Sequence, residues 1–213
     1  MRRSVVRDDV RWLSSIFITQ PIRKSPFWQG KLANIQLGAS MLDGIVVPPG
    51  GVFSFWTVIG RPSQTAGYAI GRAIRDDLVG GDIGGGLCQL SGIAYEAGLR
   101  AGLDMLERHP HSRDLYNDAE RFTPLGLDAT VVWPWKDLRL GNPYDFAVML
   151  RLGVNGFTLT AEVLGVEKIE QLHLEVTRND SAIERHVVVT RSAPGRSLLP
   201  VSEDRYVINA SPR

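Results

Sequence analysis

A glycine triplet placed directly before a helical pattern constrains the fold of this chain more than any other feature. Gly84, Gly85 and Gly86 leave the backbone free to adopt positive φ angles and to approach other groups closely. Apolar residues then recur at helical spacing as far as about Gly102. The only cysteine, Cys88, therefore lies where a tight turn enters a helix. At such a position, unpaired N–H groups and the helix dipole favour a thiolate and the binding of an oxyanion.

Cys88 is followed along the chain by residue types that assist a thiol nucleophile. His109 and His111 come downstream, and Asp128 follows in a Gly-Leu-Asp-Ala-Thr-Val run. The order is that of a nucleophile, a base and a residue that orients the base, and it is weakly similar to that of transglutaminase-like and papain-like cysteine enzymes. We expect His111 as the preferred catalytic partner of Cys88, His109 as the alternative, and Asp128 as the orienting carboxylate. A buried structural cysteine is the competing interpretation.

Several residues close to these motifs are further candidates for the site. Gln89 is a catalytic candidate because its side-chain amide is able to donate to an oxyanion; its ordinary alternative is to cap the glycine turn. Arg72 and Arg108 are able to bind a carboxylate in bidentate fashion, with surface solvation as the alternative. The residues expected to bind substrate are Gly84, Gly85, Gly86, Tyr68, Arg72, Ser91 and Arg108.

Zinc binding is the other chemistry that this set of residues allows. Cys88, His109, His111 and Asp128 are all of zinc-ligand types, and the His-x-His spacing suits two ligands on one face of a strand. The chain has neither a second cysteine nor a dense cluster of ligands. Nucleophilic or acid–base chemistry is therefore preferred, and we predict no metal site and no cofactor.

Seven short segments share the motifs and the order of one protein family. They lie at residues 51–56, 60–62, 67–72, 84–91, 107–112, 126–131 and 136–142. Together they resemble the VanW-like family, named for an accessory protein of vancomycin-resistance clusters, and they extend over about residues 30–165. The family usually has Ser-Thr where this chain has Ser91-Gly92, and an arginine where it has Leu127. The stretch between His111 and Gly126 is also longer than usual.

The resemblance implies a substrate related to the bacterial cell wall. Combined with a nucleophilic Cys88, it leads us to expect a thiol-dependent acyltransferase, peptidase or amidase that acts on a cell-wall-related peptide or amide. The alternative is a non-catalytic module that recognises a peptidoglycan peptide or a protein partner and is accessory to glycopeptide resistance. The reactivity of the thiol separates the two hypotheses.

The apolar pattern predicts the α+β class, with a single domain in which a glycine turn leads into a central helix packed on a mainly antiparallel sheet. Residues 27–165 form the VanW-like part, and residues 166–213 a β-rich C-terminal extension of the same domain. A helix is expected over residues 27–44, an extended piece over 52–56 and an irregular connection over 61–72. Strands are expected over residues 45–47, 103–107, 129–133, 146–152, 157–163, 172–177 and 186–190. Asn155-Gly156 predicts a type I′ hairpin turn.

Composition excludes several other classes of protein. A net charge of +1 over 213 residues argues against a nucleic-acid binder. A single cysteine forms no internal disulfide, so the fold does not depend on an oxidising compartment. No apolar run approaches the roughly 18 residues that a membrane-spanning helix needs. A small-molecule or peptide substrate is the expected partner, and the sequence leaves the oligomeric state open.

The N-terminal segment, residues 1–26, does not have the pattern of a signal peptide. Asp8, Asp9 and Arg11 precede a short apolar patch over residues 12–18, and no small-residue cleavage site follows. A signal peptide needs an uninterrupted apolar stretch of about 7–15 residues followed by such a site. We therefore interpret the segment as a partly helical lead-in or a peripheral element, and expect a cytoplasmic protein.

Overall fold

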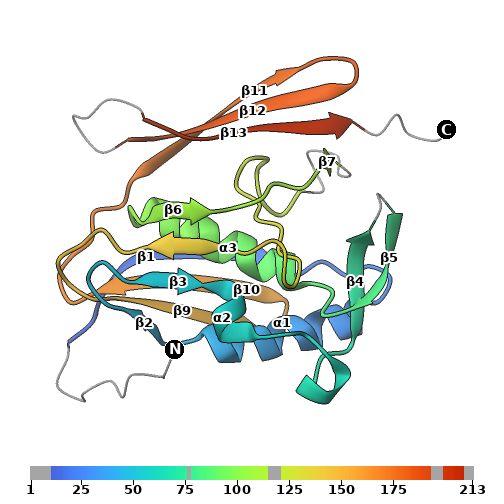
Figure 1. Cartoon of the computed structure of the whole chain (residues 1–213), viewed down its shortest axis with the longest axis horizontal. Helices are drawn as coiled ribbons and strands as arrows, with labels where there is room; N and C mark the ends of the chain where they lie inside the picture. Colours follow the sequence, from blue (N-terminus) through green and yellow to red (C-terminus); the bar gives the residue numbers. More distant parts are fainter. Residues whose placement is uncertain (1–10, 76–77, 115–120, 193–198, 209–213) are drawn as a thin grey trace.

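A computed structural model describes residues 11–75, 78–114, 121–192 and 199–208 (Figure 1). Within these ranges the chain is a single mixed α+β domain with few helices and mostly antiparallel sheets, which confirms the predicted class. No helix in this part of the chain is long and apolar enough to cross a membrane.

The main sheet has four strands in the order β1-β10-β9-β2, and all neighbouring strands are antiparallel. Its strands are β1 (Leu13–Pro21), β2 (Ile45–Val47), β9 (Val148–Asn155) and β10 (Thr158–Gly165). Alternate side chains of β9 and β10, such as Leu150 and Ala161, are buried. This alternation is the pattern of a sheet that has one face against the core.

Strand β1 corrects the expectation of a partly helical N-terminal lead-in. The apolar patch forms an edge strand of the main sheet and pairs with β10 along its length. Ile16 and Gln20 are buried while Phe17 between them is exposed, so the segment alternates with the period of a strand. The first ten residues lie outside the described part of the chain.

Two helices pack against this sheet and against each other. Helix α1 (Trp28–Leu42) contacts β9, and helix α3 (Leu87–Arg100) contacts β1 and β10. The close approach of the helices uses Gly38, where an added Cβ would stand 2.7 Å from a methyl carbon of Leu90. Helix α3 is buried on nearly every side, as expected for the predicted central helix.

Three smaller units join these elements. Strands β3 (Val52–Ser54), β8 (Arg139–Gly141) and β6 (Asp104–Glu107) form a sheet in that order, and β4 (Ile70–Arg75) pairs with β5 (Leu78–Ile83). A short helix α2 (Phe55–Ile59) and a 3₁₀ turn η1 (Gln64–Ala66) lie between β3 and β4.

Four local expectations from the sequence are wrong. The extended piece over 52–56 ends at Ser54, because its hydroxyl accepts a hydrogen bond from Thr57 and starts α2. The connection over 61–72 contains η1 and the beginning of β4. Residues 129–133 form no regular strand, and the sequence did not predict β8. The hairpin after β9 has Gly156 and Phe157 at its centre with a positive φ at Gly156 alone, which is the pattern of a type II′ turn.

The C-terminal strands form a second four-stranded sheet in the order β11-β12-β13-β7. They are β11 (His173–Asp180), β12 (Glu184–Ser192), β13 (Leu199–Ile208) and the two-residue β7 (Arg113–Asp114). Figure 1 shows the three long strands as an upper layer, with α3 between them and the main sheet. Strand β7 pairs in parallel with the end of β13, which anchors the segment directly after His111 to this layer.

Candidate functional site

The glycine turn places Cys88 in the first turn of α3. Gly86 is the N-cap of the helix with a φ of 109°, a conformation that L side chains rarely adopt. Gly85 packs so closely on Gly71 that an added Cβ would stand 2.2 Å from its carbonyl oxygen. Cys88 is half-buried, and its Sγ lies 3.6 Å from the carbonyl oxygen of Val131. The turn thus requires glycine for its own geometry and presents the thiol at the positive end of the helix.

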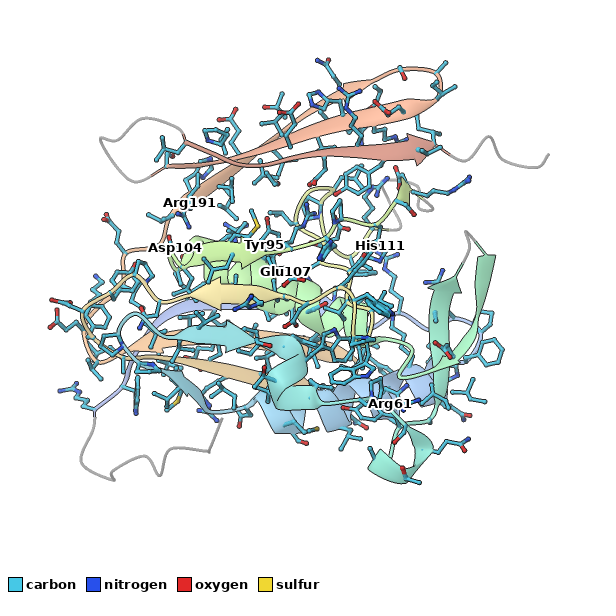
Figure 2. The ribbon with its side chains drawn as sticks, viewed as in Figure 1. Arg61, Tyr95, Asp104, Glu107, His111 and Arg191 are labelled. Atoms are coloured by element: carbon cyan, nitrogen blue, oxygen red, sulfur yellow. The ribbon has the colours of Figure 1, made fainter. Side chains whose placement is uncertain are left out.

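His111 lies between Cys88 and Asp128. Its Nδ1 is 2.6 Å from Oδ2 of Asp128, and its backbone N–H donates to the same oxygen at 2.8 Å. The side chain of Cys88 lies near enough to the imidazole to raise the pKa of His111. Figure 2 shows His111 near the right-hand end of α3, where the helix begins. The three residues therefore stand in the order thiol, imidazole and carboxylate, the arrangement of a cysteine nucleophile with its histidine partner.

The hydrogen bonds of this group determine its charge state. Burial alone would lower the pKa of His111, but its hydrogen bond to Asp128 and its interactions with the Asp128 and Cys88 side chains raise it to about 10. Burial would raise the pKa of Asp128, but His111 and Arg108 hold it well below its usual range. At neutral pH the site therefore contains an imidazolium beside a carboxylate.

Arg108 binds both the backbone carbonyl and the carboxylate of Asp128. Its side chain is only 2% exposed, its Nε donates to the backbone carbonyl of Asp128 at 2.7 Å, and its Nη2 donates to Oδ1 of Asp128 at 3.0 Å. The remaining terminal nitrogen pairs with Asp204, and the guanidinium lies over the ring of Tyr95. The sequence leads us to expect Arg108 on a substrate carboxylate. In the structure its donors are occupied by the protein, so it acts as a positioning residue.

Tyr206 is a site residue that the sequence did not reveal. It is fully buried on β13, and its hydroxyl donates to Oδ1 of Asp128 at 2.6 Å while accepting from the N–H of Gly126 at 3.0 Å. Burial and the charge of Asp128 raise the pKa of Tyr206, so the hydroxyl remains a donor at neutral pH. The sequence signal is weak: buried Asp204 and Tyr206 alternate along one strand, but no motif connects them to Asp128.

Several other predicted residues have positions that serve the fold. The Nε2 of His109 is 3.0 Å from a carboxylate oxygen of Glu107, and the structure does not bring His109 to Asp128. Gln89 donates from its amide nitrogen to the carbonyl of Pro21 on β1. Tyr68 is buried, with its hydroxyl 3.6 Å from the sulfur of Met41.

Ser91 and Arg72 remain close to the turn. The hydroxyl of Ser91 donates to the carbonyl of Ala129 at 2.6 Å, which ties α3 to the segment that carries Asp128. Arg72 lies on β4, near enough to Lys31 for its charge to lower the pKa of that lysine. Among the described residues, no three His, Cys, Asp or Glu side chains are grouped so as to hold a metal ion.

A small cavity of about 50 Å³ lies beside His111. Its lining includes His111, Asp128 and Tyr206, and several residues of the stretch that is longer than usual for the family. These are the charged residues Arg113, Asp114 and Arg121, together with Phe122, Thr123, Pro124 and Leu125. The stretch therefore contributes apolar side chains directly next to the imidazole.

Comparison with known proteins gives one family and two curated relatives. Residues 30–164 match the family described as "VanW like protein". The chain is 30% identical over 154 residues to the uncharacterized protein YoaR of Bacillus subtilis, covering 72% of this chain and 49% of that protein. It is 23% identical over 171 residues to the vancomycin B-type resistance protein VanW of Enterococcus faecalis, covering 78% of this chain and 62% of that protein. No solved structure matches the chain. The chain thus spans less than two thirds of the length of either relative.

Proposed function

The chain belongs to the VanW-like family, and we propose that it is a thiol-dependent acyltransferase, peptidase or amidase that uses Cys88 as its nucleophile. The proposed substrate is a peptide or amide related to the bacterial cell wall. The family and the resistance role in the name of the enterococcal relative support this substrate class. The cytoplasmic location proposed from the sequence would restrict the substrate to precursors of the wall.

The observation that carries the proposal is the position of His111, which interacts with Cys88 and has its Nδ1 2.6 Å from Asp128. Such an arrangement has the parts needed for acyl transfer: a thiol at a helix N-terminus, an imidazole with a raised pKa, and a carboxylate that fixes the ring. Because Nδ1 of His111 is engaged by Asp128, its Nε2 is the nitrogen left to exchange a proton with Cys88 and with a leaving group.

The proposed reaction has two steps. The thiolate of Cys88 attacks the carbonyl carbon of the amide, a C–S bond forms, and the C–N bond breaks as His111 gives its proton to the departing amine. Water or a second amine then attacks the resulting thioester while His111 takes up the proton of that nucleophile. The C–S bond breaks, and Cys88 returns as a thiolate beside the imidazolium. The N–H groups of Leu87 and Gln89 donate to Gly84 and Gly86, so the N–H of Cys88 is the first-turn group proposed to bind the oxyanion.

The test follows the acyl group on the protein. Incubation with a panel of cell-wall peptides and simple activated amides, quenched in acid, should add the mass of the acyl group to the intact chain. Cys88→Ser should abolish both this adduct and turnover. His111→Asn should lower the rate of thiol alkylation by iodoacetamide by about tenfold or more. His109→Asn is the matched control, because His109 faces Glu107, and it should leave that rate within about twofold.

A second candidate function is recognition without turnover, and the apolar cavity beside His111 supports it. A module of this kind would bind a peptidoglycan peptide or a protein partner. Full binding and an unchanged resistance phenotype in Cys88→Ser would favour recognition and reject the nucleophile. Loss of the phenotype in a folded Cys88→Ser protein that still binds the peptide would favour the enzyme.

A further inference from the structure

Lys31 is a buried lysine without an anionic partner among the described residues. It lies on α1 and exposes only 6% of its surface. The aromatic ring of Phe122, with its centroid 5.6 Å from Nζ, is the contact that the structure gives its ammonium group. Buried lysines are rare and are normally paired with a carboxylate, because removing an ammonium ion from water is costly.

The side chain of Lys31 extends from the glycine turn toward the cavity beside His111. At one end, its Cγ is so close to Gly86 that a Cβ added there would stand 2.8 Å away. Gly86 is the N-cap of the helix that carries Cys88 two residues later. At the other end, Phe122 lines the same cavity as His111. The side chain of Lys31 therefore runs from the start of α3 to Phe122, one of the residues that line the cavity beside His111.

A second cation adds to the positive charge at this place. Burial, together with the charge of Arg72 on β4, lowers the pKa of Lys31 to about 8. A buried ammonium group is unfavourable for the folded protein in its free form. A bound anion would offset the loss of hydration of the Lys31 ammonium group. The positive end of the α3 helix dipole would also attract the anion.

We propose that Lys31, assisted by Arg72, forms a subsite for an anionic group of the substrate next to Cys88. This inference rests on the proposed function and narrows its substrate class to peptides or amides with a free carboxylate close to the reacting carbonyl. The subsite also explains why position 86 is a glycine. Any side chain at Gly86 would collide with the aliphatic part of the Lys31 side chain.

The test uses two alkylating reagents that differ in charge. Because the chain has one cysteine, iodoacetate and iodoacetamide both report on Cys88 alone. The ratio of their rate constants cancels the fraction of thiolate and measures the attraction of an anion to the site. Lys31→Met should lower the iodoacetate-to-iodoacetamide ratio by roughly three- to tenfold, and Arg72→Gln should lower it in the same direction. Lys31→Arg should keep at least half of the wild-type ratio.

The matched control is Lys24→Met. Lys24 also holds its ammonium over an aromatic ring, 5.3 Å from the centroid of Trp28, but it is exposed. Its loss should leave the ratio within a factor of about 1.5. An unchanged ratio in Lys31→Met and Arg72→Gln would overturn the proposal. Circular dichroism of each variant verifies that the fold is retained.

A second arm of the experiment uses a ligand. A dipeptide with a free carboxylate should protect Cys88 from iodoacetamide at a lower concentration than the same dipeptide with a C-terminal amide. Lys31→Met should remove this difference. Equal protection by both peptides in the wild type would overturn the subsite. The rate with iodoacetamide alone tests the proposed function. If His111→Asn leaves this rate unchanged, Cys88 is not activated by His111, whatever the ratio of the iodoacetate and iodoacetamide rates is.

Discussion

Tyr206 donates a hydrogen bond to Asp128 across 78 residues of sequence, at a distance of 2.6 Å. The contact joins the last described strand of the C-terminal sheet to the carboxylate that orients His111. Each oxygen of Asp128 accepts two hydrogen bonds, Oδ1 from Arg108 and Tyr206, and Oδ2 from the backbone and ring of His111. A carboxylate held in this way has little freedom to turn, so the imidazole that it binds is fixed as well.

Removing the Tyr206 hydroxyl should weaken both the fold and the site. Tyr206→Phe leaves the N–H of Gly126 and one oxygen of Asp128 short of a partner in a buried place, at an expected cost of about 1–3 kcal/mol in the free energy of unfolding. Urea denaturation measures this cost, and iodoacetamide labelling should slow by about two- to tenfold. Tyr144→Phe, which removes a hydroxyl bonded to Ala101, should lower stability without changing the labelling rate. Equal labelling rates in both variants would mean that Tyr206 is only structural.

Asp128→Asn should change the protonation of His111. The amide keeps the shape of the carboxylate but loses its charge, so the pKa of His111 should fall from about 10 toward or below its ordinary value near 6.5. NMR titration of the imidazole measures the shift directly. In the wild type the resonances of His111 should not titrate between pH 5 and about 8. A midpoint that stays near 10 in Asp128→Asn would show that Cys88 alone holds the proton on the ring.

The same variant should change the dependence of stability on pH. The folded pKa of His111 lies above its unfolded value, so its contribution is full below about pH 6.5 and is lost as pH rises through about 10. The folded pKa of Asp128 lies below its unfolded value, so its contribution is present above about pH 4 and is lost as pH falls through the folded value. In Asp128→Asn, the free energy of unfolding should therefore depend less on pH, both in the acid range and in the alkaline range. Urea denaturation from pH 3 to 10 measures this dependence. Asp137→Asn, a change outside this pair, should leave the loss of stability at alkaline pH unchanged.

Lys31→Met should stabilise the protein while it weakens the attraction of anions. The pKa of Lys31 falls from 10.5 to about 8 on folding, so the unfolded chain binds more protons between those values and stability rises with pH across that window. At pH 7 the charged lysine costs the fold about 1–3 kcal/mol, which methionine of similar shape should recover. Thermal unfolding at pH 7 and at pH 10.5 measures the difference, with Lys24→Met as the control. A large loss of stability in Lys31→Met would instead indicate a structural role for the ammonium group.

The order of the residues along the chain predicts that Cys88, a histidine (His111 or, alternatively, His109) and Asp128 meet, and in the structure it is His111 that bonds to Asp128. The glycine turn specifies where the helix begins, and the short spacing between the histidine and the aspartate limits how far apart they lie. The sequence assigns Arg108 the wrong task, because it does not show that this side chain points into the protein. The sequence does not predict the role of Tyr206, since its contact with Asp128 arises only when the C-terminal sheet packs over α3.

The predicted strand over residues 129–133 shows how tertiary contacts override a local pattern. Its β-branched and apolar residues are typical of a strand, but its backbone groups form hydrogen bonds with other parts of the protein instead of with a neighbouring strand. Ala129 accepts from Ser91, Thr130 donates to His109, and Val131 accepts from the thiol of Cys88. These bonds to helix α3 and to the segment at His109 replace the regular pairing of a strand. They also place the segment beside the site that its sequence helped to identify.

The parallel pairing of β7 with β13 means that the working unit of this protein is larger than the region its family shares. Residues 30–164 carry the thiol, the imidazole and the carboxylate, whereas Asp204 and Tyr206, which neutralise Arg108 and brace Asp128, come from beyond that boundary. A version of this protein cut at the end of the shared region would therefore leave Arg108 and Asp128 each without a buried partner, and His111 would hold its proton less strongly.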